Sequence, residues 1–217
     1  MIRDLQRKYR KPVAIGEFGW IDDFVRKFDD IGIHLHDGIW GSLMGGAVGG
    51  ALVWYWDSYV HPNRLERHFR PVEAFWRGEQ ITQRLGPVPM TLSDSDLAGW
   101  GTGRRDRAYV WIKNRTHTID AYLDYRCTLA KERLAKARGQ SPAAPTYPPR
   151  VVRGATATLS GLDWYSRYRV EWWDPYRGRI TERAVSRSAN GAVTIHVPTV
   201  EYDLAAKLIK LKWWEGG

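Results

Sequence analysis

The sequence predicts a chain of two parts, a strand-helix-strand-helix unit over residues 1–85 and an antiparallel β-sandwich over residues 90–212. Three observations lead to this fold class, which is α/β plus β. Two short apolar runs in the first part are each followed by a helical pattern, the order found in parallel sheets. The composition changes at residues 86–89, where the sequence GPVP is typical of a linker. Several short strand-like runs separated by turn residues then follow, as in a sandwich.

The two predicted strands of the first part are residues 12–20 (PVAIGEFGW) and 51–57 (ALVWYWD). Both runs are short, continuous and bounded by glycine or proline, which is typical of strands buried on both faces of a parallel sheet. Residues 36–44 predict a helix between them, because their apolar side chains recur on one helical face. Residues 63–76 have the same periodicity and predict a closing helix.

The second part is dominated by short runs of β-branched and aromatic residues. Asp174-Pro175 with Gly178, and the pair Asn190-Gly191, supply turn chemistry between them. Residues 122–136 interrupt this pattern and predict a helix. The predicted strands are residues 107–114, 155–162, 168–173, 180–185, 193–197 and 204–211.

Composition excludes several classes of protein. The 217 residues carry a net charge of +9 and a single cysteine, so an intrachain disulfide is impossible and a Cys/His zinc site is not expected. No apolar run approaches the length of a membrane span. The basic residues are scattered, which disfavours a nucleic-acid partner despite the charge. We therefore expect no metal, no cofactor, no nucleic acid and no membrane partner.

Glu17 is placed for chemistry, because it follows the first predicted strand directly and lies between glycine and an aromatic residue. In barrels of alternating strands and helices the reactive groups sit at the carboxyl ends of the strands. A carboxylate beside aromatic rings suits a sugar, which needs an acid at the anomeric carbon and flat surfaces for its ring faces. Residue pattern alone leaves two alternatives open: Glu17 as a cap of the next loop, and Trp54 and Trp56 as core residues.

Two motifs carry a resemblance to a known family. KPVAIGEFGW resembles the seventh-strand motif of clan A glycoside hydrolases of the cellulase and β-mannanase type, and GGALVWYWDSYVHP is similar to their eighth strand. The similarity extends through HFRPVEAFWRG. It implies that residues 1–85 are the last two βα units of a (β/α)₈ TIM barrel.

The same resemblance implies roles for individual residues. Glu17 would be the catalytic nucleophile, and Trp54 or Trp56 would be the sugar platform of a retaining enzyme that cleaves β-linked glycans of the mannan or glucan type. Trp20, Asp57 and His36 would line the cleft. For His36, an ordinary position at a helix N-terminus is an equal alternative.

The sequence departs from the family pattern in one essential respect. Retaining hydrolysis needs a second carboxylic acid, which in this family belongs to an Asn-Glu pair ending the fourth strand. These 217 residues contain no Asn-Glu pair. We therefore expect a fragment of a longer enzyme, inactive by itself, and secreted if the full-length protein carries a signal peptide. The alternative is a non-catalytic carbohydrate-binding or accessory module.

Residues 90–212 resemble the β-sandwich appended to many such hydrolases, with GLDWYSRYRVEWWDPYRGRITER as its central hairpin. Because side chains alternate along a strand, Trp172 and Trp173 must point to opposite faces. We expect one of them in the sandwich core and the other against the barrel, or free to hold a sugar. We also expect residues 90–212 to fold alone and residues 1–80 to need a neighbour.

Overall fold

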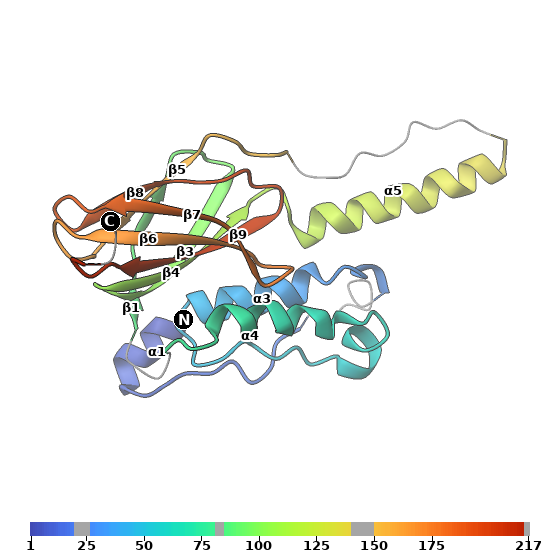
Figure 1. Ribbon diagram of the computed structural model, residues 1–217. Coiled ribbons are helices and arrows are strands. Elements are labelled where there is room, and N and C mark those ends of the chain that lie inside the picture. The colour runs from blue at the N-terminus through green and yellow to red at the C-terminus, as the bar shows by residue number, and fades with distance from the viewer. Residues whose placement is uncertain (20–26, 81–84, 140–149, 215–217) are drawn as a thin grey trace.

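The computed structural model describes residues 1–19, 27–80, 85–139 and 150–214 (Figure 1). It consists of an antiparallel β-sandwich with a helical layer along one sheet and one long helix projecting from an end. The predicted site residue Trp20 lies outside the described residues.

The first part begins with α1 (Ile2–Tyr9) and contains α3 (Ile33–Met44), η1 (Trp56–Val60), η2 (Leu65–His68) and α4 (Phe69–Trp76). Before and after α3 run two extended segments that lie side by side. Phe18 and Val53 form a parallel bridge. The Phe18 N–H donates to the Leu52 carbonyl at 2.9 Å, and the Trp54 N–H donates to the Phe18 carbonyl at 2.8 Å. An extended segment, helix α3 and a second extended segment, parallel to the first, therefore follow one another along the chain.

Neither extended segment is a regular strand, in contrast to the prediction. The ladder is irregular before Phe18, because the Leu52 N–H reaches back to the Ile15 carbonyl at 3.4 Å. The second segment ends at Tyr55, whose carbonyl accepts the N–H groups of Tyr59 and Val60 and starts the π-helical turn η1. The prediction of a strand as far as residue 57 is thus wrong.

Helix α3 begins three residues earlier than predicted because Asp29 caps it. The Asp29 carboxylate accepts the N–H groups of Gly32, Ile33 and His34, each at 2.9 Å. Gly32 has a φ of 80°, in the left-handed region where a side chain is strained. The Tyr59 hydroxyl donates to the same carboxylate at 2.6 Å, which ties η1 to the start of α3.

The second part is a sandwich of two antiparallel sheets. One is six-stranded in the order β1-β3-β4-β9-β6-β7, and the other is three-stranded in the order β2-β5-β8. The bounds are β1 (Gly86–Pro87), β2 (Met90–Leu92), β3 (Leu97–Arg104), β4 (Arg107–Asn114), β5 (Thr156–Ser160), β6 (Arg167–Asp174), β7 (Arg179–Arg187), β8 (Ala192–His196) and β9 (Asp203–Lys210). All six predicted strands are present, as is the antiparallel sandwich they predicted.

Strand β3 was not predicted because glycine occupies alternate positions in its sequence, LAGWGTGR. The structure explains these glycines. A Cβ at Gly99 would lie 2.1 Å from the Met90 side chain, and one at Gly101 would lie 2.9 Å from the Val88 carbonyl oxygen. The chain that links β1 to β2 crosses β3 here, and only a strand without side chains on that face leaves room for it.

Between the sandwich strands, α5 (Ile119–Ala137) is the predicted interrupting helix, and it projects away from the rest of the molecule (Figure 1). Thr118 caps its start, since its hydroxyl accepts the Ala121 N–H at 3.2 Å. Among the described residues, no helix has the combination of length and apolar character that would let it cross a bilayer.

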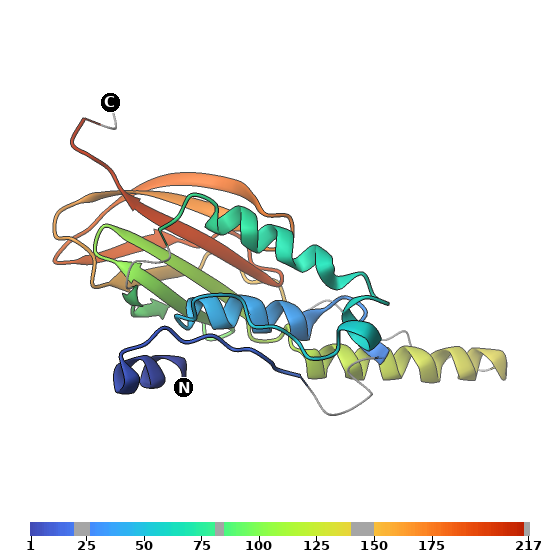
Figure 2. The same ribbon diagram turned by 90° about the horizontal axis from the view of Figure 1, so that it is seen from below.

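Helices α3 and α4 cover the outer face of the six-stranded sheet (Figures 1 and 2). Phe75 of α4 is fully buried between the two layers. Its ring contacts Trp40 of α3 and Trp173 of β6 edge-on, at centroid distances of 5.2 and 5.5 Å. Trp172 instead points into the sandwich core. One Trp of the pair is therefore core and the other meets the helices, as expected, and removing residues 1–80 would uncover an aromatic sheet face.

Phe75→Ala should lower the free energy of unfolding of the whole chain by about 3–5 kcal/mol, because it leaves a cavity between helices and sheet. Urea unfolding followed by tryptophan fluorescence measures this, with exposed Leu134→Ala as the control. A variant whose sandwich still unfolds at the wild-type urea concentration would show that the helical layer does not stabilise the sheet.

Candidate functional site

Glu17 lies on an open face of the parallel segment pair. Phe18 and Val53, which form the bridge, point toward α3, and Val53 is buried. Because side chains alternate along extended chain, the neighbours of these two residues point the opposite way. Glu17 is exposed, as are Leu52 at 46% and Trp54 at 58%. We call these three residues the Glu17 face.

Trp56 and Asp57 lie beyond the parallel pair, in the turn η1. Both are exposed. The Trp56 ring stacks on Phe69 at a centroid distance of 5.7 Å and an interplanar angle of 11°, so one of its faces is covered. Of the two predicted sugar platforms, Trp54 belongs to the segment that pairs with Phe18, and Trp56 belongs to the next turn.

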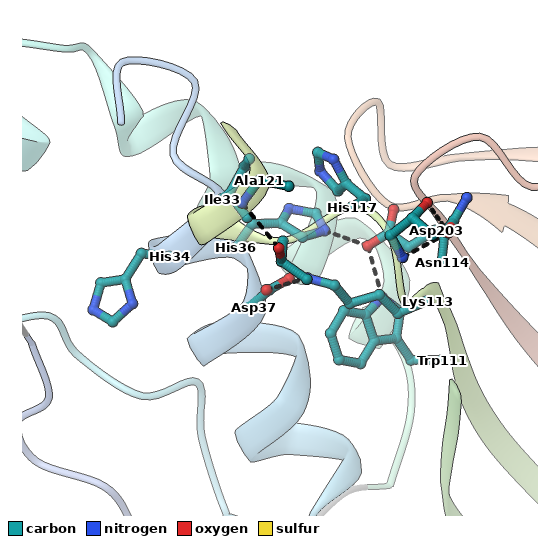
Figure 3. Close-up of polar contacts among 12 residues, drawn as sticks. Ile33, His34, His36, Asp37, Trp111, Lys113, Asn114, His117, Ala121 and Asp203 are labelled. Carbon is teal, nitrogen blue, oxygen red and sulfur yellow. Dashed lines mark hydrogen bonds and ion pairs between the residues drawn. The ribbon is translucent and has the colours of Figure 1, made fainter. Parts of the chain in front are cut away.

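His36 does not lie on this exposed surface, which corrects the predicted position in the cleft. Its side chain is 1% exposed and is enclosed between α3 and the sheet (Figure 3). Its Nε2 lies 2.7 Å from Asp203 Oδ2, and its ring stacks on Tyr176 at 4.2 Å. The helical pattern located the helix correctly, but the side of α3 that carries His36 is the one that meets the sheet.

The buried cluster around His36 is a polar connection between helix and sheet. Asp203 Oδ2 also accepts the indole N–H of Trp111 at 2.7 Å. Lys113 of β4 forms a second ion pair with Asp37 of α3 (Figure 3). Sequence reasoning missed both residues because Lys113 lies within a predicted strand and Asp203 directly precedes one. A charged residue at such a position is the signal that could have found them.

Hydrogen-bond accounting assigns the charges in this cluster. His68 Nε2 lies 2.9 Å from the Ile31 carbonyl and therefore carries a proton. Burial, together with the positive charges of His36 and Arg67, lowers the pKa of His68 to about 3, so this ring is neutral. Its Nδ1 must then accept a proton from His36 Nδ1, 3.2 Å away. His36 donates at both nitrogens and is an imidazolium.

The carboxylate of Asp203 is the counterion of this imidazolium. Burial alone would raise the pKa of Asp203, but the charge and hydrogen bond of His36, the Trp111 indole and the charge of Lys113 lower it below its ordinary value. The pair is closed to solvent and has no nucleophile beside it in the hydrogen bonds described. We read it as a structural connection, separate from the Glu17 face.

Within the described ranges, no group of three or more His, Cys, Asp or Glu side chains is arranged to hold a metal ion.

No family model matches the sequence, and no curated protein matches it. Solved structures match this chain coarsely, among them the following two. A GH30 endoxylanase from Clostridium papyrosolvens C71 shares 11% identity at a TM-score of 0.47, over 95% of this chain and 44% of that one. Alpha-L-fucosidase isoenzyme 2 from Paenibacillus thiaminolyticus shares 12% identity at a TM-score of 0.30, over 63% of this chain and 17% of that one. The chain spans less than half the length of either.

Asp203→Asn should lower the free energy of unfolding by about 3 kcal/mol, because it leaves the buried His36 imidazolium without its counterion. Urea unfolding at pH 7.5 measures the change, and half-exposed Asp106→Asn is the control. Equal midpoints for the two variants would contradict the assigned charges.

Acid should destabilise the protein before its carboxylates titrate. Burial lowers the pKa of His68 to about 3 and, with Lys113, that of His117 to about 4, whereas unfolded histidine titrates near 6.5. Between pH 6.5 and 4 the unfolded chain thus binds more protons, so stability falls as pH falls, by up to about 1.4 kcal/mol per pH unit for each histidine.

Urea unfolding from pH 7.5 to 4.5 tests this dependence. His68→Gln should make it shallower, whereas His61→Gln, at a side chain 85% exposed, should not. Parallel curves for wild type and His68→Gln would mean that His68 is protonated in the folded protein.

Proposed function

We propose that this chain is the C-terminal part of a retaining glycoside hydrolase that cleaves β-linked glycans of the mannan or glucan type, with Glu17 as the nucleophile. One observation carries the proposal: Glu17 and Trp54 lie on neighbouring parallel segments and share an exposed face. Carboxylate and indole are the groups that a glycosidase brings to one sugar ring. The sequence motifs around both residues support the same assignment.

In this mechanism a carboxylate oxygen of Glu17 attacks the anomeric carbon as the bond to the leaving oxygen breaks. A second carboxylic acid protonates that oxygen. The conjugate base of this acid then deprotonates water, whose oxygen displaces Glu17 from the glycosyl-enzyme, and the sugar leaves with retained configuration. Trp54 would hold the flat face of the pyranose beside Glu17. Trp56 and Asp57 follow directly along the chain and would extend the cleft.

The second acid must come from a polypeptide segment other than these 217 residues, since the sequence contains no Asn-Glu pair. The geometry of the extended segments agrees with such a neighbour. Within the described residues, the segment around Phe18 has backbone hydrogen bonds to one side only, toward residues 48–54. A barrel strand has a neighbour on each side, so an additional strand would complete this edge.

The test begins with the DNA upstream of the Met1 codon. We expect an open frame that encodes further strand-helix units with an Asn-Glu pair. The extended protein should hydrolyse soluble β-mannan or β-glucan, and NMR of the first product should show the β-anomer. Glu17→Gln should lower kcat by about 10⁴-fold or more, because it removes the nucleophile.

Glu73→Gln is the matched control, since Glu73 is an exposed acid on α4 that pairs with Arg77. Full activity of Glu17→Gln in the extended protein would refute the role of Glu17. A stop codon directly upstream would favour the second candidate function, a carbohydrate-binding module in which the exposed tryptophans hold a glycan without cleaving it.

A further inference from the structure

The sandwich carries a second exposed aromatic pair, in the loop between β5 and β6. Trp164 is 67% exposed and Tyr165 is 76% exposed. Their loop lies beside the β3–β4 turn, since the Asp163 N–H donates to the Arg105 carbonyl at 3.1 Å. This is the end of the sandwich opposite α5 (Figure 1). We call Trp164 and Tyr165 the loop platform.

The loop platform is held rigidly although its rings are open to solvent. The Ser166 N–H donates to Ser188 Oγ at 2.7 Å, and this hydroxyl donates to the Asp163 carbonyl at 2.6 Å. The Tyr165 hydroxyl donates to Asn190 Oδ1 at 2.9 Å. Side chain and backbone of the β7–β8 turn therefore fix the conformation of the whole loop.

Trp164 rests on the backbone of this turn. A Cβ at Gly191 would lie 3.0 Å from the indole Nε1, so only glycine allows the ring to approach so closely. The rings of Trp164 and Tyr165 stand at 77° to each other with centroids 6.3 Å apart, which forms a right-angled corner of two apolar surfaces.

Stability does not account for this arrangement. Rings that are two-thirds or more exposed gain little from burial. Tyr165 has left-handed backbone, with a φ of 48°, which costs a non-glycine residue about 1 kcal/mol or more. Strain that holds aromatic rings open to solvent is typical of binding sites.

We propose that the loop platform binds the pyranose rings of an extended, neutral β-linked glycan, with one ring on Trp164 and the edge of Tyr165 beside it. Flat, exposed apolar surfaces fit the C–H faces of pyranoses. Two polar groups at the corner carry no unpaired charge: Asn190 is an amide, and Asp163 forms an ion pair with Lys210 at 2.7 Å. Such groups suit sugar hydroxyls better than phosphates. The β-linkage of the glycan rests on the proposed function, whereas the proposal that Trp164 and Tyr165 bind a sugar does not.

The experiment is isothermal titration calorimetry of the full chain at pH 7.5 with β-1,4-linked cellohexaose and mannohexaose. Every variant carries Trp54→Ala, so that the Glu17 face does not contribute. We expect Trp54→Ala to bind at least one of these sugars. Adding Trp164→Ala should weaken that binding by about tenfold or more, as loss of a central aromatic anchor does. Adding Tyr9→Ala, at an exposed ring on α1, should change nothing.

Three results would overturn the proposal: no binding of either sugar by Trp54→Ala, unchanged binding after Trp164→Ala, or strongly salt-dependent binding of a single-stranded oligonucleotide that Trp164→Ala removes. If wild type bound a sugar and Trp54→Ala bound neither, the proposed function of the Glu17 face would remain intact. A further result would separate the two proposals. If an extended protein bound sugar through Trp164 while its Glu17→Gln variant stayed active, the proposed function would be refuted. The proposal for the loop platform would still stand.

Discussion

The aromatic layer between the helices and the six-stranded sheet is the constraint on which the rest of the structure depends. Trp40 and Phe75 pack from the helices against Tyr109, Trp111 and neighbouring residues of the sheet. Each such ring buries about 150–250 Å². Without this layer, α3 and α4 would have one exposed apolar side each, and the parallel segments that flank α3 would have no support. The position of the Glu17 face therefore follows from packing on the sandwich.

Ion pairs within this layer fix the helices in register with the strands. Lys207 of β9 is buried and reaches Glu79, just after α4, at 2.7 Å, and the Tyr109 hydroxyl donates to the same carboxylate. His36 and Asp203 do the same for α3. Buried pairs of this kind contribute little net stability, because desolvation offsets their attraction. A shifted helix would leave the charges unpaired, however, so the pairs select one arrangement among those that the aromatic packing would allow.

Sequence patterns predicted those parts of the fold that local rules determine. Six sandwich strands were predicted because their apolar and polar residues alternate and because turn residues end them. Strand β3 was missed because its glycines, which make room for the crossing chain, remove this alternation. The irregular segments around Phe18 and Val53 were predicted as strands because their composition suits a buried sheet. Glu17 and Trp54 lie on neighbouring segments, because the Phe18–Val53 bridge joins the two motifs that contain them. The surroundings of His36 depend on Asp203, 167 residues away, which no local pattern contains.

Glu17 is a carboxylate within an otherwise apolar, exposed face. Parallel strands are normally covered on both faces. Here α3 covers one face, while Leu52 and Trp54 remain exposed on the other beside Glu17. If another layer of protein packed on this face, Glu17 would lose its hydration and would need a buried partner. If the face lined a cleft, the carboxylate would keep access to water and substrate while the indole met the sugar. The carboxylate within an apolar face therefore favours a cleft.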